Sequence, residues 1–184
     1  MAKLTIAIPN FNGGKKLKNA IESCKLIKIP KDELEILIVD NKSTDNSIEI
    51  INELERKIPN LRLIKNKENV GRIQNWNVCI ENCDSKYITF LFTNDLISKD
   101  NNVHEVLKIL DSDNSISVSL SPVIKIENDR KYVKRKYFDK PTKCLSKKIS
   151  EESLKRGLFP FGFIESNIFR TEDIKDISNY FLDS

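Results

Sequence analysis

Asp95 is the residue whose type and position most directly suggest chemistry. It closes an apolar run that begins at Tyr87, and Thr93 and Asn94 come directly before it. Such a run, rich in β-branched and aromatic residues, is typical of a strand buried on both faces. In open α/β sheets, polar groups that follow a strand lie where ligands bind, and a carboxylate there can hold a divalent cation. All three residue types are also good helix N-caps, so a purely structural interpretation stays open.

Two other polar loops follow predicted strands. The first strand covers residues 4–9 and ends at Pro9, because proline cannot donate to a sheet ladder; the loop 10–14 follows it. The second strand covers residues 35–39 and leads into Asp-Asn-Lys-Ser-Thr-Asp at 40–45. A carboxylate accepts hydrogen bonds from a base or a ribose, and asparagine side chains both donate and accept. These loops are therefore suited to a nucleoside.

The elements that position these loops alternate along the chain. Further strands are predicted over residues 61–64, from Tyr87 onward, and over 115–126, and apolar residues recur at helical spacing in the segments between the strands. This alternation predicts an α/β fold with a doubly wound, mostly parallel sheet flanked by helices. The right-handed crossover rule then places the loops after the first, second and fourth strands at one edge. We expect the following side chains to line one crevice: Phe11, Asn12, Asp40, Asn41, Ser43 and Asp95.

Composition excludes several classes of protein. With 39% hydrophobic and 32% charged residues in 184, the chain suits one soluble globular domain. The net charge of +4 is mild, and its excess lies in residues 125–148, so nucleic acid is not the expected partner. The 4 cysteines form no metal-binding pair and fit a reducing cytoplasm. No stretch reaches the roughly 20 apolar residues of a membrane span, so any membrane contact is expected to be peripheral.

Several segments, in order, resemble the family-2 glycosyltransferases of the GT-A fold. Residues 5–12 look like that family's opening strand with its Pro-x-(Tyr/Phe)-Asn loop, and residues 36–45 are similar to its second strand followed by Asp-(Asp/Asn)-x-Ser-x-Asp. Residues 69–71, followed by Asn77, resemble its Asn-x-Gly segment. Residues 90–95 occupy the place of its acidic metal motif. The ordered set is far more specific than any one piece.

The resemblance implies a site for a nucleotide-diphosphate sugar. Pro9, Phe11 and Asn12 would border the nucleoside, and Asp40 would bind the base. Asn69, Gly71 and Arg72 would approach the ribose or the diphosphate. For Arg72 there is also a physical case, because guanidinium pairs well with phosphate oxygens. A surface arginine at a helix start is an equally good interpretation. The implied donor-binding residues are Pro9, Phe11, Asn12, Asp40, Asn41, Ser43, Asn69, Gly71, Arg72 and Asn94.

The metal motif departs from the family pattern. Many relatives carry a run of acidic residues here, whereas Phe92, Thr93 and Asn94 precede the single Asp95 in this chain. One carboxylate can still ligate Mg²⁺ or Mn²⁺ alongside a diphosphate and waters, with weaker binding. The resemblance thus implies that Asp95 acts in catalysis through a metal that stabilises the leaving diphosphate, while the acceptor hydroxyl attacks with inversion.

The catalytic base of the family is a carboxylate that comes later in the chain. Glu165, Glu172 and Asp173 are the candidates, and a base must reach the proton that it abstracts. The last two also suit the first turn of a helix capped by Thr171, and that structural interpretation is favoured for them. Glu165 is carried forward as the base candidate. Because the chain ends at Ser184, soon after an apolar segment, a truncated domain is expected.

These inferences define one main hypothesis and two alternatives. Residues 1–184 are expected to form one GT-A domain, with a donor-binding half over 1–100 and a partial acceptor half over 101–184. The expected partners are a nucleotide-sugar donor and an unidentified glycan or lipid-linked acceptor, in cell-surface polysaccharide synthesis. The alternatives are a nucleotide-sugar-binding domain without turnover, and an anion- or nucleic-acid-binding α/β module that uses residues 125–148. The oligomeric state stays open.

Overall fold

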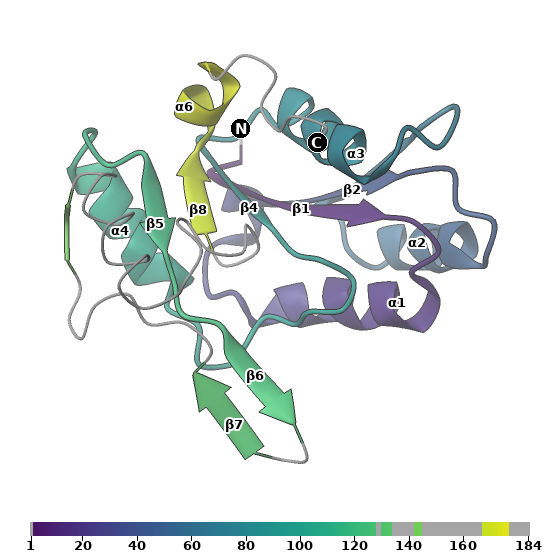
Figure 1. Ribbon diagram of the computed structural model, residues 1–184, viewed down its shortest axis with the longest axis horizontal. Helices are drawn as coiled ribbons and strands as arrows, with labels where there is room; N and C mark the ends of the chain where they lie inside the picture. The colour runs from purple at the N-terminus through teal and green to yellow at the C-terminus, as the bar shows by residue number, and fades with distance from the viewer. Residues whose placement is uncertain (1, 128–129, 134–141, 145–166, 177–184) are drawn as a thin grey trace.

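A six-stranded mixed sheet forms the centre of the protein. The computed structural model describes residues 2–127, 130–133, 142–144 and 167–176 (Figure 1). The strands of the sheet lie in the order β3-β2-β1-β4-β8-β5. Their bounds are β1 (Leu4–Asn10), β2 (Leu34–Asp40), β3 (Leu61–Lys65), β4 (Tyr87–Phe90), β5 (Val118–Leu120) and β8 (Asn167–Arg170). A separate two-stranded sheet pairs β6 (Ile124–Glu127) with β7 (Arg130–Val133).

Strand direction confirms the predicted fold class. The β1 strand pairs in parallel with both β2 and β4, and β2 pairs in parallel with β3. The β8 strand runs antiparallel to both of its neighbours, β4 and β5. The sheet is therefore mostly parallel, and its antiparallel strand comes from the last part of the chain.

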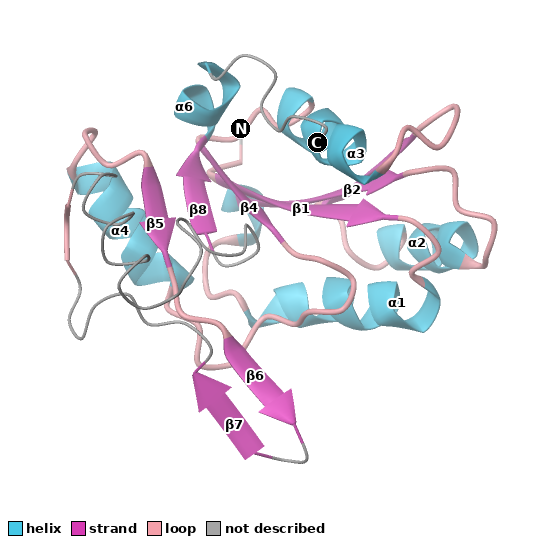
Figure 2. Cartoon of the chain, viewed as in Figure 1, coloured by secondary structure: helices cyan, strands magenta, loops and turns pink. Residues whose placement is uncertain are grey.

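Helices cover both faces of this sheet. The helices α1 (Gly14–Ser23), α2 (Ser47–Glu55) and α4 (Val103–Ser112) lie on one face, and α3 (Arg72–Glu81) and α6 (Thr171–Asp176) lie on the other (Figure 2). Short 3-10 turns, η1 (Cys24–Leu26) and η2 (Lys31–Glu33), connect α1 to β2. Alternate residues of β1 explain the two layers, because Ile6 and Ile8 pack with the first group whereas Ala7 packs with the second. Both faces of the central strands are buried, as their continuous apolar sequences predict.

The helices bury stripes at the expected spacing. On α1, Leu17, Ala20 and Ile21 are buried and lysines alternate with them. Cys79 is fully buried on α3, and burial raises the pKa of the Cys24 thiol to about 12, so these cysteines pack as small apolar residues. Across the described ranges, no helix combines the length and apolar character needed to cross a bilayer.

One predicted strand was wrong in its extent. Residues 115–126 were expected to form a single strand, but β5 ends at Leu120, β6 begins at Ile124, and the two belong to different sheets. Pro122 lies between them, and its missing N–H interrupts a ladder at this point. The alternation of apolar residues continued through the proline and concealed the break.

The β8 strand was not predicted at all. Its four residues are too few to show a period, and it forms because it pairs with β4 and β5. Arg170 ends it, is 2% exposed, and donates through Nη2 to the carbonyls of Leu110 at 2.8 Å and Ile116 at 3.3 Å. The buried guanidinium therefore joins β8 to the carboxyl end of α4, where the helix dipole favours a cation.

Candidate functional site

Three loops meet at the carboxyl edge of the sheet. The β1 strand lies between β2 and β4, and all three are parallel. Asn10 is in register with Asp40, and the amide of Leu91 donates to the carbonyl of Ala7 at 2.9 Å just past the end of β4. The loops that start after residues 10, 40 and 90 therefore leave the sheet side by side. This confirms the expectation that Asp40 and Asp95 belong to loops at one edge.

Asp40 organises the loops of β1 and β2. Its carboxylate is 2% exposed and accepts hydrogen bonds from Asn10 Nδ2 at 2.7 Å, Ser43 Oγ at 2.6 Å and the Ser43 amide at 2.9 Å. The Ser43 hydroxyl in turn accepts from the Asn12 amide at 2.9 Å. A carboxylate offers about four acceptor positions, so three of them are used within the protein. One acceptor position of Asp40 is thus not used by these three hydrogen bonds.

Asn12 fastens the first loop to the second. It adopts a left-handed backbone with φ of 53°, and its Oδ1 accepts from the amides of Thr44 at 2.7 Å and Asp45 at 3.3 Å. Asparagine tolerates this backbone better than most residues do. Phe11, by contrast, is 51% exposed beside it, and Pro9 is half-buried. The ring of Phe11 is therefore presented to solvent.

Gly13 lets the β1 loop approach the β4 loop. A Cβ atom at this position would lie 2.3 Å from Asn10 Oδ1 and 3.1 Å from Thr93 Cγ2. The same Asn10 oxygen is buried and has no hydrogen-bond partner among the described residues. Only glycine fits here without displacing Asn10, whose Nδ2 holds Asp40. Sequence reasoning missed Asn10, because its position carries no fixed residue type in the family pattern.

Asn41 orders the segment that leads into α3. It is buried, its Nδ2 donates to Asn69 Oδ1 at 2.8 Å, and its Oδ1 accepts from the Val70 amide at 2.9 Å and from Asn66 Nδ2 at 3.0 Å. Asn69 Oδ1 also accepts from the Gly71 amide at 3.0 Å. The predicted binding residues Asn41 and Asn69 are thus joined to each other. Their contacts with the Val70 and Gly71 amides position the loop.

Arg72 begins α3 next to a strained glycine. Gly71 has φ of 83° and ψ of 168°, a conformation that is almost restricted to glycine. The exposed guanidinium of Arg72 lies 5.5 Å from the ring centroid of Trp76, and that ring stacks on Phe92 with centroids 5.1 Å apart. Trp76 thus packs on the sheet side of α3, against the buried core of that face. The stack connects Arg72 to the loop that follows β4.

The loop after β4 holds Asp95 and Asn94. The Asp95 amide donates to the Phe92 carbonyl at 2.9 Å, which forms a tight turn at the end of the strand. The exposed side chain of Asn94 accepts a hydrogen bond from Lys16 Nζ at 2.9 Å. Lys16 lies in the first turn of α1, and no local sequence signal indicated this contact between residues 78 positions apart.

The fit of a divalent cation to this loop is limited. Asp95 is the only carboxylate between residues 91 and 99, and the neighbouring amide oxygen of Asn94 already accepts from an ammonium group. Within the described ranges, no group of three or more His, Cys, Asp or Glu side chains could hold a metal ion. Magnesium in nucleotide sites uses one or two carboxylates together with substrate phosphates. Asp95 fits that role only as a partner of a bound diphosphate.

The base candidates do not gather at this edge. Glu165 lies outside the described residues. Glu172 and Asp173 are in the first turn of α6, which follows β8, and the Thr171 amide donates to the Lys86 carbonyl at 3.0 Å. Lys86 precedes β4, so α6 begins at the amino edge of the sheet, opposite the three loops. The structure therefore does not bring Glu172 or Asp173 to the candidate site.

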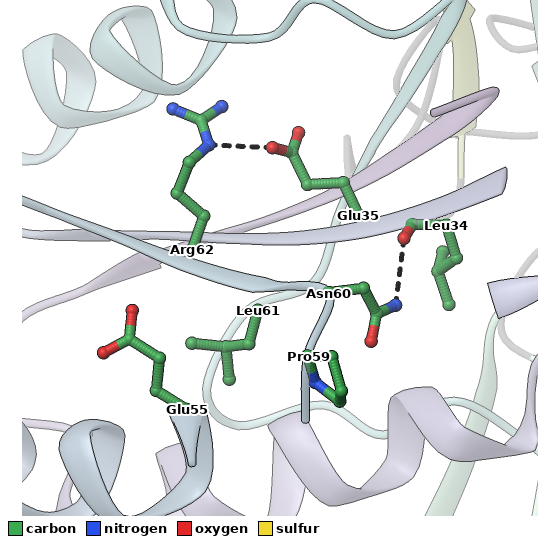
Figure 3. A pocket seen from close by; sticks show the side chains of 7 residues that line it. All are labelled: Leu34, Glu35, Glu55, Pro59, Asn60, Leu61 and Arg62. Atoms are coloured by element: carbon green, nitrogen blue, oxygen red, sulfur yellow. Dashed lines mark hydrogen bonds and ion pairs between the residues drawn. The ribbon is translucent and has the colours of Figure 1, made fainter. Parts of the chain in front are cut away.

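A shallow groove of about 410 Å³ lies at that opposite edge (Figure 3). Glu35 in this groove pairs with Arg62 Nε at 2.8 Å and accepts from Thr5 Oγ1 at 2.7 Å. The carboxylate of Glu35 is thus paired within the protein. In open α/β sheets, ligands bind at the carboxyl edge and not at this one. We regard the carboxyl edge as the candidate site. The groove is lined by Leu34, Glu35, Glu55, Pro59, Asn60, Leu61 and Arg62.

Comparison with known proteins agrees with the geometry of the site. The family profile described as "Glycosyl transferase family 2" matches residues 5–177, which is most of the chain. The protein therefore belongs to glycosyl transferase family 2.

Two curated relatives match about half of the chain. A poly(ribitol-phosphate) beta-glucosyltransferase of Bacillus spizizenii is 31% identical over 99 residues, which cover 53% of this chain and 16% of that protein. An uncharacterized glycosyltransferase of Haemophilus influenzae is 33% identical over 100 residues, covering 54% of this chain and 39% of that protein. The matched part thus spans well under half the length of these relatives.

Solved structures share the fold. TarS of S. aureus, residues 1–349, in complex with UDP-GlcNAc superimposes with a TM-score of 0.75 at 23% identity, covering 95% of this chain and 47% of that one. Mannosyltransferase PcManGT of Pyrobaculum calidifontis, in complex with GDP-Man and Mn²⁺, gives 0.70 at 17% identity, covering 96% and 46%. These similarities confirm the GT-A glycosyltransferase fold.

Proposed function

We propose that this chain binds a nucleotide-diphosphate sugar at the carboxyl edge of β1, β2 and β4 and transfers the sugar to an acceptor hydroxyl with inversion. The observation that carries this proposal is the convergence of three polar loops on one sheet edge, held together by Asp40 and its partners. Family membership and the nucleotide-sugar complexes of proteins with the same fold support it.

The side chains divide into two groups in this proposal. Asp40, Asn12, Ser43, Asn41 and Asn69 hold the loops in place, and Asp40 retains one acceptor position for an N–H of the base. Phe11 offers an exposed ring for stacking on the base or ribose. Arg72 offers an exposed guanidinium for the diphosphate. Ligand contacts thus come from a few side chains on a fixed frame.

A divalent cation, Mg²⁺ or Mn²⁺, would join this site together with the donor. Asp95 would contribute one carboxylate oxygen, and the diphosphate and waters would complete the ligand shell. Such a cation neutralises charge on the leaving diphosphate. Because Asp95 is the single carboxylate of its loop, we expect weak affinity for the cation alone and stronger affinity when a nucleoside diphosphate is present.

The names of the relatives suggest an acceptor and a cellular location for the transfer. The Bacillus spizizenii relative is named for poly(ribitol-phosphate), a polymer that presents free hydroxyl groups. We propose a hydroxyl of a cell-surface polymer or its lipid-linked precursor as the acceptor, with transfer on the cytoplasmic side. The catalytic base is assigned to the later part of the chain, where Glu165 is the candidate.

A thermal-shift screen tests donor binding. We expect UDP, GDP, ADP or CDP to raise the melting temperature, with a further rise when Mn²⁺ is added, since a ligand that binds only the native state stabilises it. Asp95→Ala should remove the part of the rise that depends on Mn²⁺. An unchanged Mn²⁺ effect in this variant would exclude Asp95 as the ligand.

A second measurement separates transfer from binding alone. We expect the chain to release a nucleoside diphosphate from the matching nucleotide sugar, either to an acceptor or by slow hydrolysis. Stabilisation without any release would favour the alternative of a binding domain without turnover. If no nucleotide stabilises the protein but nucleic acid binds in a salt-sensitive way, the α/β anion-binding alternative is favoured instead.

A further inference from the structure

Two cationic side chains of the protein flank the loop that follows β4. Arg72 reaches it through Trp76 and Phe92, and Lys16 reaches it through Asn94. Phe92 and Asn94 are two positions apart, so their Cα atoms are separated by at most about 7 Å. Each cation thus meets the loop that would carry a metal in this fold, Lys16 through Asn94 and Arg72 through the Trp76 ring that stacks on Phe92.

Lys16 is well placed to receive an anion. Its ammonium group has three donor positions, and its one hydrogen bond within the described residues goes to Asn94 Oδ1 at 2.9 Å. The side chain is exposed and makes no ion pair with a described carboxylate. Asn94 is neutral, so it orients the ammonium without cancelling its charge. Two donor positions therefore remain for phosphate oxygens.

The residue types of the loop explain why cations gather here. Where many relatives have acidic residues, this chain has an aromatic ring at 92 and an amide at 94. A carboxylate at position 92 or 94 would attract a divalent cation or neutralise a nearby basic side chain. The ring instead stacks on Trp76 beneath Arg72, and the amide binds Lys16. An aromatic ring and an amide at these positions thus contact Trp76 and Lys16 without adding negative charge to the loop.

We infer that Lys16 is a diphosphate-binding residue, and that Lys16 together with Arg72 lets this chain bind a nucleoside diphosphate without a divalent cation. This inference rests on the proposed function. It names Lys16 and Arg72 as the cations that neutralise the diphosphate of the donor. A cation at Asp95 then adds to an affinity that already exists. Lysine is a common phosphate ligand as a point charge, and arginine adds a planar fork.

Isothermal titration calorimetry with UDP, GDP, ADP and CDP, in EDTA and in Mn²⁺, tests the inference. The wild-type protein should bind one of these in EDTA with an affinity within about tenfold of that in Mn²⁺. Lys16→Met should weaken binding in EDTA by about tenfold or more, because a charge-assisted hydrogen bond is lost. Lys16→Arg should retain most of the affinity, since it keeps the charge.

Two further variants test the role of the Lys16 charge, one as a matched control and one that adds an opposite charge beside it. Lys25→Met removes the same charge from an exposed position in η1, beyond the far end of α1, and should leave binding in EDTA unchanged. Asn94→Asp places a carboxylate against Lys16, so it should weaken binding in EDTA and make binding more dependent on Mn²⁺. A purely structural role for Lys16 would not change the dependence on Mn²⁺.

Each outcome decides between the inference and the function on which it rests. Binding in Mn²⁺ but not in EDTA, or equal binding by wild type and Lys16→Met, would overturn the inference and leave donor binding intact. Absence of nucleotide binding under both conditions would overturn the proposed function together with the inference. Retention in Lys16→Arg and loss in Lys16→Met would support the role of the charge.

Discussion

Most polar side chains of the site are engaged within the protein. Asp40 accepts three hydrogen bonds from Asn10 and Ser43, and Asn41 joins Asn69 to the segment that leads into α3. Since an isolated buried polar group is costly, these contacts fix the loops before any ligand arrives. In the proposed site, recognition would depend on the exposed side chains, above all Phe11, together with Lys16 and Arg72 beside the loop that follows β4.

Sequence patterns predicted which residue types lie at this edge. They did not predict which of these side chains are hydrogen-bonded within the protein and which are exposed. The place of Asp40 at the end of a buried strand indicated a ligand-binding edge, and that position is confirmed. Whether a carboxylate faces a ligand or its own loop depends on long-range partners such as Asn10, 30 positions away. Lys16 was missed for the same reason, because its contact with Asn94 spans 78 positions.

Phe11 provides a prediction at the scale of one residue. Its ring is 51% exposed, so Phe11→Ala should leave the melting temperature of the free protein almost unchanged. If the ring stacks on the nucleoside, the variant should lose about 1–3 kcal/mol of nucleotide-binding free energy. Titration calorimetry against a nucleoside diphosphate measures this loss.

Two variants complete that test. Phe11→Tyr keeps the aromatic face and should retain most of the affinity. Ile109→Ala removes another exposed apolar side chain, on α4, and should have no effect on binding. Equal affinities of wild type and Phe11→Ala would show that the ring does not touch the nucleoside.

At the scale of elements, periodicity explains both the successes and the failures. Helices α1 and α4 were predicted because several turns of each bury one stripe. The β8 strand has four residues and was missed, since its pairing with β4 and β5 decides its conformation. The break between β5 and β6 at Pro122 required knowledge of which sheet each segment joins.

The carboxyl end of α4 is fastened to the sheet by Asp111. It lies 2.6 Å from Lys3 Nζ and 2.7 Å from Lys86 Nζ, and it accepts from the Tyr87 hydroxyl at 2.9 Å. Burial alone raises the pKa of this carboxyl, but the hydrogen bonds from Lys3, Lys86 and Tyr87 outweigh it and hold the pKa well below its usual range. The cluster therefore links the end of α4 to residues next to β1 and β4.

The cluster predicts a stability contribution that depends on pH. Since the folded pKa is lowered, the contribution is fully present above the unfolded value of about 4 and is lost as the pH falls below it. Between pH 5 and pH 2, the melting temperature of wild type should fall more than that of Asp111→Asn. At pH 7 the variant should be less stable by about 1 kcal/mol, because the lysines are partly exposed and screened.

The control for this prediction removes an exposed carboxylate elsewhere. Asp84→Asn changes the net charge equally, and Asp84 is exposed in the loop before β4. Its melting temperature should follow wild type as the pH falls. If Asp111→Asn and wild type lose stability in parallel between pH 5 and pH 2, the ionic cluster makes no measurable contribution.

At the scale of the whole molecule, the parallel strands explain why the site could be located from sequence. Strands β1, β2 and β4 share one direction, so loops separated by tens of residues emerge together. The described strands of the later part, β5 to β8, pair antiparallel, and the acceptor half and the base at Glu165 stay predictions. The donor-binding half over residues 1–100 also stays a prediction.

Hydrogen–deuterium exchange with and without a saturating nucleoside diphosphate and Mn²⁺ tests whether the donor binds at the carboxyl ends of β1, β2 and β4. We expect the ligand to slow exchange in four segments of this edge: 9–13, 40–45, 69–72 and 91–95. The groove at the opposite edge, lined by residues such as Glu35 and Arg62, should exchange at the same rate in both states. Protection of that groove, with unchanged exchange in the four loop segments, would contradict a donor site at the carboxyl ends of β1, β2 and β4.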